Sequence, residues 1–374
     1  MVSVVPRLAP GSTFAERFRI VSYVGQGSMG SVYRAESLAD GSDVALKITK
    51  LDLARDPRAL RRFQREAESG ARLASPHIAR TLDSGTLGDG GLAWIAMEFA
   101  EGESLQELVD RRERLALADT RRVLGQLFAA LAAAHAAHIV HRDLKPENVR
   151  VAGEGDQLSV KVLDFGIAKD FGVDTFSGTA PGLGTPLWTA PEQAREGYAP
   201  RPSADVWALG LLAFYALTGV PYWRNAAPRA SMADLALELI KGELVPASAR
   251  LAELGLEIEL PAGFDAWFAR AVVREPEARF TDAAQAWQAL EPLLIASPRR
   301  ATSDSGGGAG APPTHATTSE RSSQAPPTHA TTSERGSQRR AVVLARPAVF
   351  LSFVILSCVA MGLTIYWLLR SARI

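Results

Sequence analysis

The pattern of apolar and polar positions divides the chain into a core-forming part and a C-terminal appendage. Up to about residue 295, apolar, aromatic and charged residues are mixed in the proportions of a folded domain. Residues 18–24 and 44–48 alternate in polarity and are rich in β-branched side chains, which predicts strands. Residues 60–67 have helical spacing. The chain is therefore expected to begin with a strand-rich unit that also contains a helix.

A polar tract follows over residues 296–346. It consists largely of Ser, Thr, Pro, Gly and Ala, and residues 311–321 recur in the same order as residues 325–335. So few large apolar side chains cannot offset the entropy of ordering the backbone. The composition therefore predicts a disordered linker that contains a direct repeat.

Residues 347–369 carry no charged side chain and are rich in Val, Leu, Ile and Phe. As a helix this segment would span roughly 34 Å, enough for a hydrocarbon core of about 30 Å. The alternative is a buried core helix, but a helix behind a flexible linker has no domain to bury it. More arginines precede the segment than follow it, which predicts a cytoplasmic N-terminal side. We expect a single-pass protein of the cell membrane, anchored in the lipid bilayer, with residues 370–374 as a short non-cytoplasmic tail.

Composition and charge narrow the classes of function. The 374 residues include 41 Lys and Arg and 41 Asp and Glu, so no overall charge favours nucleic acid, and we expect no nucleic-acid partner. Cys358 is the single cysteine, which excludes an internal disulfide and a multi-cysteine metal cluster. Residues 1–10 lack the apolar core of an export signal, and we treat residues 1–17 as an N-terminal lead.

A glycine-rich stretch connects the first two predicted strands. Gly25, Gly27 and Gly30 fit the spacing G-x-G-x-x-G-x-V, in which missing side chains let backbone N–H groups approach phosphate oxygens. The same pattern also occurs in plain hairpin turns, and the related dinucleotide fingerprint would open a helix. Because residues 31–35 and 44–48 continue as strands, we expect a hairpin that folds over phosphates.

Lys47 lies among apolar residues of the third predicted strand. A buried ammonium requires an anionic partner, although an edge-strand lysine with no special role is the plain alternative. Glu66, on the predicted helix, is the favoured partner, and it would hold Lys47 against the α- and β-phosphates. Glu68 is the competing candidate, because only one of the two can point at Lys47.

Residues 141–148 read HRDLKPEN, the most specific motif of the chain. Each polar position has a task in phosphoryl transfer: Asp143 receives a hydroxyl proton, Lys145 steadies the γ-phosphate and Asn148 holds a metal. Asp164 begins the motif DFG after a predicted hairpin over residues 149–162, and its carboxylate can bridge Mg²⁺ to the phosphates.

These motifs resemble the signature elements of eukaryotic-type protein kinases, and their details are similar to the bacterial Hanks-type serine/threonine branch. The resemblance covers residues 18–295. It implies an α+β, bilobal fold: an N-lobe with an antiparallel sheet and one helix, and a mainly helical C-lobe. It also implies transfer of the γ-phosphate of ATP to Ser and Thr hydroxyls of protein substrates, with Mg²⁺ as the metal and Mn²⁺ as the alternative.

The resemblance assigns further residues. Thr185 is implied to shape the acceptor site beside Asp143 and Lys145. Met97 resembles the gatekeeper, and Glu98 and Ala100 belong to the hinge that offers backbone groups to adenine. The whole implied nucleotide site consists of Gly25, Gly27, Gly30, Val32, Ala45, Lys47, Met97, Glu98, Ala100 and Arg150.

Other positions are implied to support the site. Asp205 would hydrogen-bond the backbone of the catalytic loop, and Glu192 would pair with Arg279 inside the domain. Arg150 departs from the family, whose members usually place an apolar residue beneath the adenine. The aliphatic stem of Arg150 could still cover the ring.

Regulation is expected on the activation segment, residues 164–192. Arg142, just before Asp143, would grip a phosphate there, and the candidate phosphosites are Ser177, Thr179 and Thr175. We expect autophosphorylation in trans within a homodimer, promoted by membrane tethering. The alternatives are a catalytically silent scaffold and a small-molecule phosphotransferase, although the latter class lacks the segment at residues 190–192.

Overall fold

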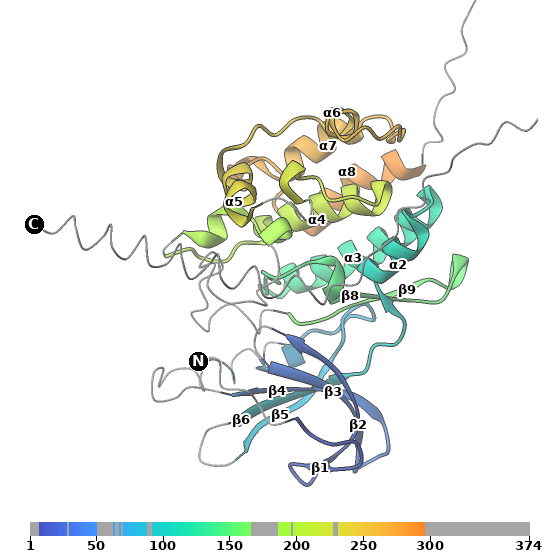
Figure 1. Ribbon diagram of the computed structural model, residues 1–374, viewed down its shortest axis with the longest axis vertical. Coiled ribbons are helices and arrows are strands. Elements are labelled where there is room, and N and C mark those ends of the chain that lie inside the picture. Colours follow the sequence, from blue (N-terminus) through green and yellow to red (C-terminus); the bar gives the residue numbers. More distant parts are fainter. Residues whose placement is uncertain are drawn as a thin grey trace, which may run out of the picture. The chain divides into compact units, whose positions relative to one another are not determined.

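A computed structural model describes most of the core-forming part of the chain (Figure 1). The described residues are 7–27, 30–50, 63, 67–68, 70–87, 92–165, 186–195, 197–226 and 231–295. Among them, no helix has the length and apolar character needed to cross a bilayer. The predicted linker and the predicted membrane helix at residues 347–369 lie outside the described residues.

The N-lobe is built on a six-stranded sheet in which all neighbouring strands are antiparallel. The order of the strands is β1-β2-β3-β4-β6-β5. Their bounds are β1 (Thr13–Phe14), β2 (Phe18–Gly27), β3 (Gly30–Ser37), β4 (Asp43–Lys50), β5 (Thr81–Leu87) and β6 (Leu92–Glu98). One face is apolar and carries Tyr33, Leu46 and Ile48, which are fully buried. Lys47 points to the other face, because side chains alternate along a strand.

The folded unit begins earlier than the sequence indicated. β1 pairs with β2, the Phe14 ring is buried, and the backbone N–H of Leu8 donates to the Tyr33 hydroxyl at 3.2 Å. Leu8, Phe14 and Ala15 of the predicted lead therefore pack on the apolar face of the sheet. A two-residue strand is too short to show periodicity, which is why the pattern of the sequence missed it.

A second, smaller sheet follows the N-lobe in the order β7-β8-β9. Its strands are β7 (Glu103–Ser104), β8 (Val149–Ala152) and β9 (Ser159–Val162). β8 and β9 are antiparallel, which confirms the hairpin predicted over residues 149–162. Figure 1 shows this hairpin between the large sheet and the helices.

The C-lobe is mainly helical. Its helices are α2 (Leu105–Arg112), α3 (Leu117–Ala136), α4 (Pro202–Thr218), α5 (Met232–Lys241), α6 (Ala247–Glu253), α7 (Phe264–Ala271) and α8 (Ala283–Ile295). Short 3-10 turns are η1 (Pro146–Asn148), η2 (Gly155–Gln157), η4 (Pro186–Trp188), η5 (Pro191–Ala194), η6 (Arg224–Ala226) and η7 (Pro276–Ala278). The side chains of α4 are buried from Ser203 to Thr218, as expected of a helix that is apolar on all faces. It packs against α3, α7 and α8 and forms the centre of the lobe.

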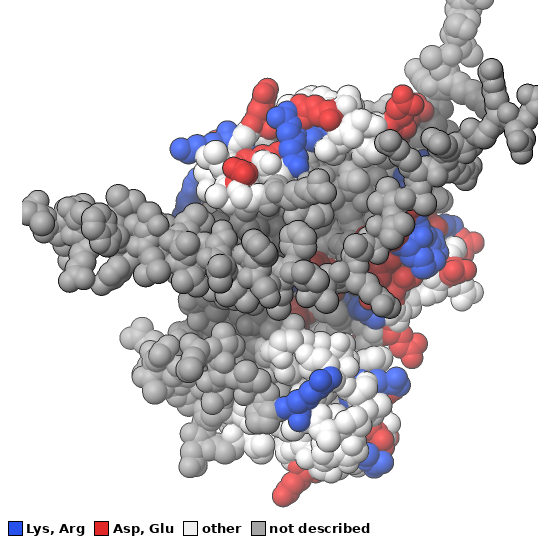
Figure 2. Space-filling model, in the orientation of Figure 1, with Lys and Arg blue, Asp and Glu red and all other residues white. Residues whose placement is uncertain are grey.

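The predicted bilobal fold is confirmed by this arrangement. The described residues 63, 67–68 and 70–71 have helical backbone, near the helix predicted over residues 60–67. On the face shown in Figure 2, Lys and Arg are interspersed with Asp and Glu. That mixture agrees with the equal numbers of acidic and basic residues in the sequence.

Candidate active site

The catalytic loop, residues 141–148, is held by the buried helix α4. Asp205 on α4 is 1% exposed, and its carboxylate accepts the backbone N–H of His141 at 2.7 Å and that of Arg142 at 2.9 Å. The support predicted for Asp205 is thereby confirmed. Hydrogen bonds to a carboxylate are stronger than neutral ones, so the loop is attached firmly to the most buried helix of the C-lobe.

Asp205 has a further partner that sequence reasoning missed. His135 of α3 lies 2.9 Å from the Asp205 carboxylate through Nε2, while its Nδ1 accepts the backbone N–H of Ala283 at 3.2 Å. These contacts assign the imidazole proton to Nε2. Burial alone would raise the pKa of Asp205, but His135 and His141 outweigh it and hold that pKa below its ordinary value. A histidine on an alanine-rich helix gave no local signal of this role.

The polar side chains of the loop converge on Asp143. The Lys145 ammonium lies 3.1 Å from its carboxylate, and the Asn148 amide donates to its backbone carbonyl at 2.8 Å. Burial lowers the pKa of Lys145, but the negative charges of Asp143, Glu147 and Asp164 outweigh burial, so that its pKa is raised. Lys145 therefore stays positively charged at neutral pH.

Lys47 connects the N-lobe to Asp164, the second residue after β9. Its ammonium lies 3.0 Å from the Asp164 carboxylate, and Lys47 is only 9% exposed. Asp164 has a left-handed backbone with φ 56°, and the next side chain, Phe165, is buried against the His141 ring at 4.7 Å between centroids. The sequence placed Lys47 and Asp164 at one site but did not predict their ion pair.

Of the remaining predicted residues, one lies in the described part of the chain and five lie outside it. Glu68, the competing partner for Lys47, is described and is exposed. The predicted residues outside the described part of the chain are Glu66, Thr185, Thr175, Ser177 and Thr179. Their roles remain predictions.

The glycine-rich stretch forms the predicted hairpin. Gly27 and Gly30 face each other at the end of the β2–β3 ladder. A Cβ at Gly30 would lie 2.0 Å from the Ile48 carbonyl oxygen, so glycine is required there for the close approach of two backbones. In the β3–β4 ladder Val32 lies opposite Lys47, and in the β4–β6 ladder Ala45 lies opposite Met97, so these positions share one face of the sheet.

The hinge residues continue from β6 toward α2. Met97 is 6% exposed and packs with Phe63, Ala67 and Ile95. Glu98 ends β6, and Ala100 follows it before β7 begins. The capping box of α2, in which Ser104 and Glu107 hydrogen-bond each other, fixes where the hinge ends.

Arg150 lies on β8 beneath the hinge. Its guanidinium donates to the Gly102 carbonyl and lies 3.6 Å from the Glu107 carboxylate. The guanidinium is therefore bound by residues that follow β6. The aliphatic stem of Arg150 is the part of the side chain that can cover a base. This orientation could not be read from the sequence.

Asn148 and Asp164 are the candidate metal ligands. Among the residues that the structure describes, no group of three or more His, Cys, Asp or Glu side chains could hold a metal by itself. Mg²⁺ in nucleotide sites needs only one or two protein ligands, because phosphates and water complete its octahedron. One carboxylate and one amide oxygen fit that donor set.

The predicted ion pair between Glu192 and Arg279 is confirmed. The guanidinium donates to the two carboxylate oxygens at 2.7 and 2.9 Å, and Arg279 is 2% exposed. Because Glu192 ends the activation segment, the pair attaches that end to the C-lobe.

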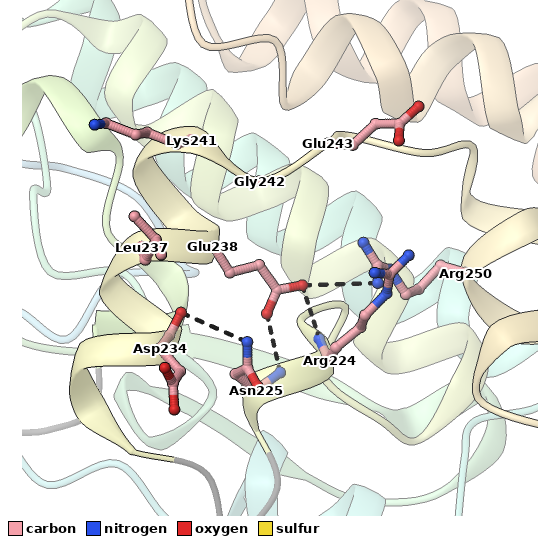
Figure 3. Close-up of a pocket in the computed structure, with 9 residues that line it drawn as sticks. All are labelled: Arg224, Asn225, Asp234, Leu237, Glu238, Lys241, Gly242, Glu243 and Arg250. Carbon is pink, nitrogen blue, oxygen red and sulfur yellow. Dashed lines mark hydrogen bonds and ion pairs between the residues drawn. The ribbon is translucent and has the colours of Figure 1, made fainter.

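A pocket of about 520 Å³ lies elsewhere in the C-lobe, between η6, α5 and α6 (Figure 3). Glu238 accepts the backbone N–H groups of Arg224 and Asn225 and lies 3.6 Å from the Arg250 guanidinium. Glu253 binds Arg224 as well. These acidic and basic groups balance each other, and we assign the pocket a structural role in joining η6 to the two helices.

Comparisons with known proteins agree with this geometry. A serine/threonine-protein kinase of Myxococcus xanthus, pkn3, is 39% identical over 223 residues, which cover 58% of this chain and 40% of that protein. PrkC of Bacillus subtilis, also a serine/threonine-protein kinase, is 36% identical over 229 residues, covering 61% of this chain and 34% of that protein. The kinase domain of Mycobacterium tuberculosis PknI, known from crystal structures, is 28% identical with a TM-score of 0.58 and covers 77% of this chain and 99% of that domain.

The family assignment rests on a further finding. The profile of the protein kinase domain matches residues 18–280. The chain spans less than half the length of the two curated relatives named above. By its profile match and its relatives, the chain belongs to the bacterial Hanks-type serine/threonine protein kinase family.

Proposed function

We propose that this chain transfers the γ-phosphate of ATP to Ser and Thr hydroxyls of proteins. The observation that carries the proposal is the convergence of Lys47 and Asp164, 3.0 Å apart, with Lys145 and Asp143, 3.1 Å apart. The first pair joins the lobes and the second belongs to the catalytic loop. Two cations and two carboxylates at one site match what phosphoryl transfer requires of a protein, namely positioning and charge stabilisation.

Each residue has a defined task in the proposed reaction. The Asp143 carboxylate accepts the proton of the attacking hydroxyl, and Lys145 stabilises the negative charge of the transferred phosphoryl group. Lys47 contacts the α- and β-phosphates. Asn148 and Asp164 would hold Mg²⁺ or Mn²⁺, which supplies neutralisation of the phosphate charges.

The nucleotide would bind against the face of the N-lobe sheet that carries Lys47. Gly25, Gly27 and Gly30 bring backbone N–H groups to the phosphates. Val32, Ala45 and Met97 share the face that would cover the base, and Glu98 and Ala100 offer backbone groups from the hinge. Arg150 would contribute its aliphatic stem from below.

The proposal extends to the parts outside the described residues. Glu66 would orient Lys47, Thr185 would shape the acceptor site, and Ser177, Thr179 and Thr175 would be phosphorylated in trans by a second copy. The kinase domain of residues 18–295 would be cytoplasmic, tethered by the linker of residues 296–346 to a membrane helix at 347–369.

Intact-mass analysis tests the enzymatic proposal. The full chain, freed of phosphate and incubated with ATP and Mg²⁺, should gain whole phosphate groups, whereas the Asp143→Asn variant should gain none. Equal masses before and after incubation, with added Ser/Thr substrates also unmodified, would favour the silent scaffold instead.

Membrane fractionation tests the anchor. The full chain should sediment with membranes after washing in high salt, and deletion of residues 347–374 should release it. Release of the full chain by salt alone would contradict a spanning helix.

A further inference from the structure

Two basic side chains face each other across the β8–β9 hairpin. Arg150 of β8 lies directly opposite Lys161 of β9. Their neighbours Val149, Val151 and Val160 are buried, so the two cations share the other face. Like charges at directly opposite positions repel each other and destabilise a ladder unless other groups compensate them. In this hairpin the compensating groups are the Glu98 carboxylate at the end of β6 and the Gly102 carbonyl in the segment that follows β6.

Lys161 reaches the start of the hinge. Its ammonium lies 2.8 Å from the Glu98 carboxylate, and the two side chains are 30% and 29% exposed. Glu98 is the last residue of β6 in the N-lobe sheet, whereas Lys161 belongs to the smaller sheet. The ion pair therefore joins two sheets, and its partial burial makes it less screened than a surface pair.

Arg150 reaches the other end of the hinge. Its guanidinium donates to the carbonyl of Gly102. Gly102 has φ 90°, and a Cβ there would lie 2.1 Å from the Val151 carbonyl oxygen, so the hinge backbone rests directly on β8. Segment 98–102 is thus held at its first residue by Lys161 and at its last by Arg150.

The same hairpin is fixed to the proposed metal ligands. The N–H of Leu163, one residue after β9, donates to the Asn148 carbonyl at 2.8 Å, and Asp164 follows directly. The hairpin also pairs with the segment before β5, because the Val162 N–H donates to the His77 carbonyl at 2.8 Å. A displacement of segment 98–102 relative to β8 and β9 is therefore a displacement relative to Asn148 and Asp164.

We propose that Lys161 and Arg150 are positioning residues that hold the two ends of segment 98–102 in register with the phosphate-binding residues. The inference rests on the proposed function, in which this segment contacts the base of ATP. It also explains the departure at Arg150: a guanidinium at this position secures the hinge, which an apolar side chain could not do.

Nucleotide binding by single variants of the full chain tests the inference. Lys161→Met and Arg150→Met remove the charged groups but keep apolar stems. Each should weaken the binding of ADP with Mg²⁺, measured by titration calorimetry, by about threefold to tenfold, the size expected for a partly buried charged contact. The KM for ATP should rise by a similar factor while kcat stays unchanged. Lys161→Arg, which keeps the charge, should restore wild-type affinity.

Arg80→Met is the matched control. Arg80 lies 3.9 Å from the same Glu98 carboxylate but is 66% exposed and does not extend from the β8–β9 hairpin. Its removal should leave ADP affinity at the wild-type value. Unchanged affinity in Lys161→Met and Arg150→Met, or an equal loss in Arg80→Met, would overturn the inference. A wild-type chain that binds no nucleotide would instead overturn the proposed function on which the inference rests.

Discussion

The ammonium of Lys47 and the carboxylate of Asp164 lie 3.0 Å apart, and this ion pair joins the N-lobe sheet to the end of the β8–β9 hairpin. Lys47 is 9% exposed, so the pair forms where water screens charge weakly. Phosphates and a metal entering the site would come between these two groups. The pair therefore joins the two lobes in this structure, and binding of the proposed substrate would replace the direct contact.

Replacing Lys47 should abolish most of the proposed activity. In Lys47→Met the phosphates lose a positioned cation, and phosphoryl transfer should fall by about 100-fold or more. Initial rates with labelled ATP check this value. Lys241→Met, at an exposed position of α5, is the control and should retain the wild-type rate. A Lys47→Met variant within twofold of wild type would contradict the assignment.

Removing one partner of the buried Glu192–Arg279 pair should lower the free energy of unfolding strongly. Arg279→Met leaves the Glu192 carboxylate buried without its partner, which should cost about 3–5 kcal/mol of unfolding free energy. Denaturant titration of the full chain measures the loss. Glu192→Met combined with Arg279→Met should recover part of it, because no buried charge then remains unpaired. A single-variant loss below about 1 kcal/mol would contradict this account.

Gly102 should tolerate no side chain. In Gly102→Ala the methyl group meets the Val151 carbonyl in a left-handed conformation, so the unfolding free energy should fall by more than about 1–3 kcal/mol. Gly41 has φ 75°, and a Cβ at that position would have no neighbouring atom within 4 Å, so Gly41→Ala is the matched control for conformation alone. Denaturant titration compares the two variants. Equal losses in both would show that contact with β8 has no effect.

Acid should remove the stabilisation that Asp205 provides. Its folded pKa is lowered, so its contribution is complete above the ordinary pKa of about 3.9 and is lost as pH falls through the folded value. The unfolding free energies of wild type and Asp205→Asn should therefore differ by a constant amount from pH 7 to about 5 and converge below about pH 4. If the two unfolding free energies converged between pH 7 and 6, the pH dependence would belong to another group.

The sequence was sufficient for the parts of the site that are local in the chain. The motif at residues 141–148 and the hairpin over residues 149–162 are each formed by consecutive residues, so a local pattern was enough to predict them. The structure has the predicted hairpin. Asp205 and Arg279 lie far along the chain from their partners, and only the resemblance to a family assigned them. Both contacts are confirmed.

Contacts that depend on tertiary packing could not be predicted in this way. His135 meets Asp205 and the start of α8 only because three helices pack together. In the sequence, Lys161 and Arg150 are two charged residues in predicted strands. Their contacts with Glu98 and Gly102 become visible only in the folded structure. Their role depends on which face of β8 and β9 is buried, and a four-residue strand gives too few positions to decide that.

The most direct test of the central claim is transfer of labelled phosphate from the γ-position of ATP to a Ser/Thr-containing protein acceptor. The wild-type full chain with Mg²⁺ should produce phosphoserine or phosphothreonine, and chelation of the metal should stop the reaction. Asp143→Asn, which keeps the shape of the side chain but not its basicity, should reduce the rate by about 100-fold or more. Label transfer by Asp143→Asn at the wild-type rate, or no transfer by the wild type, would contradict the account.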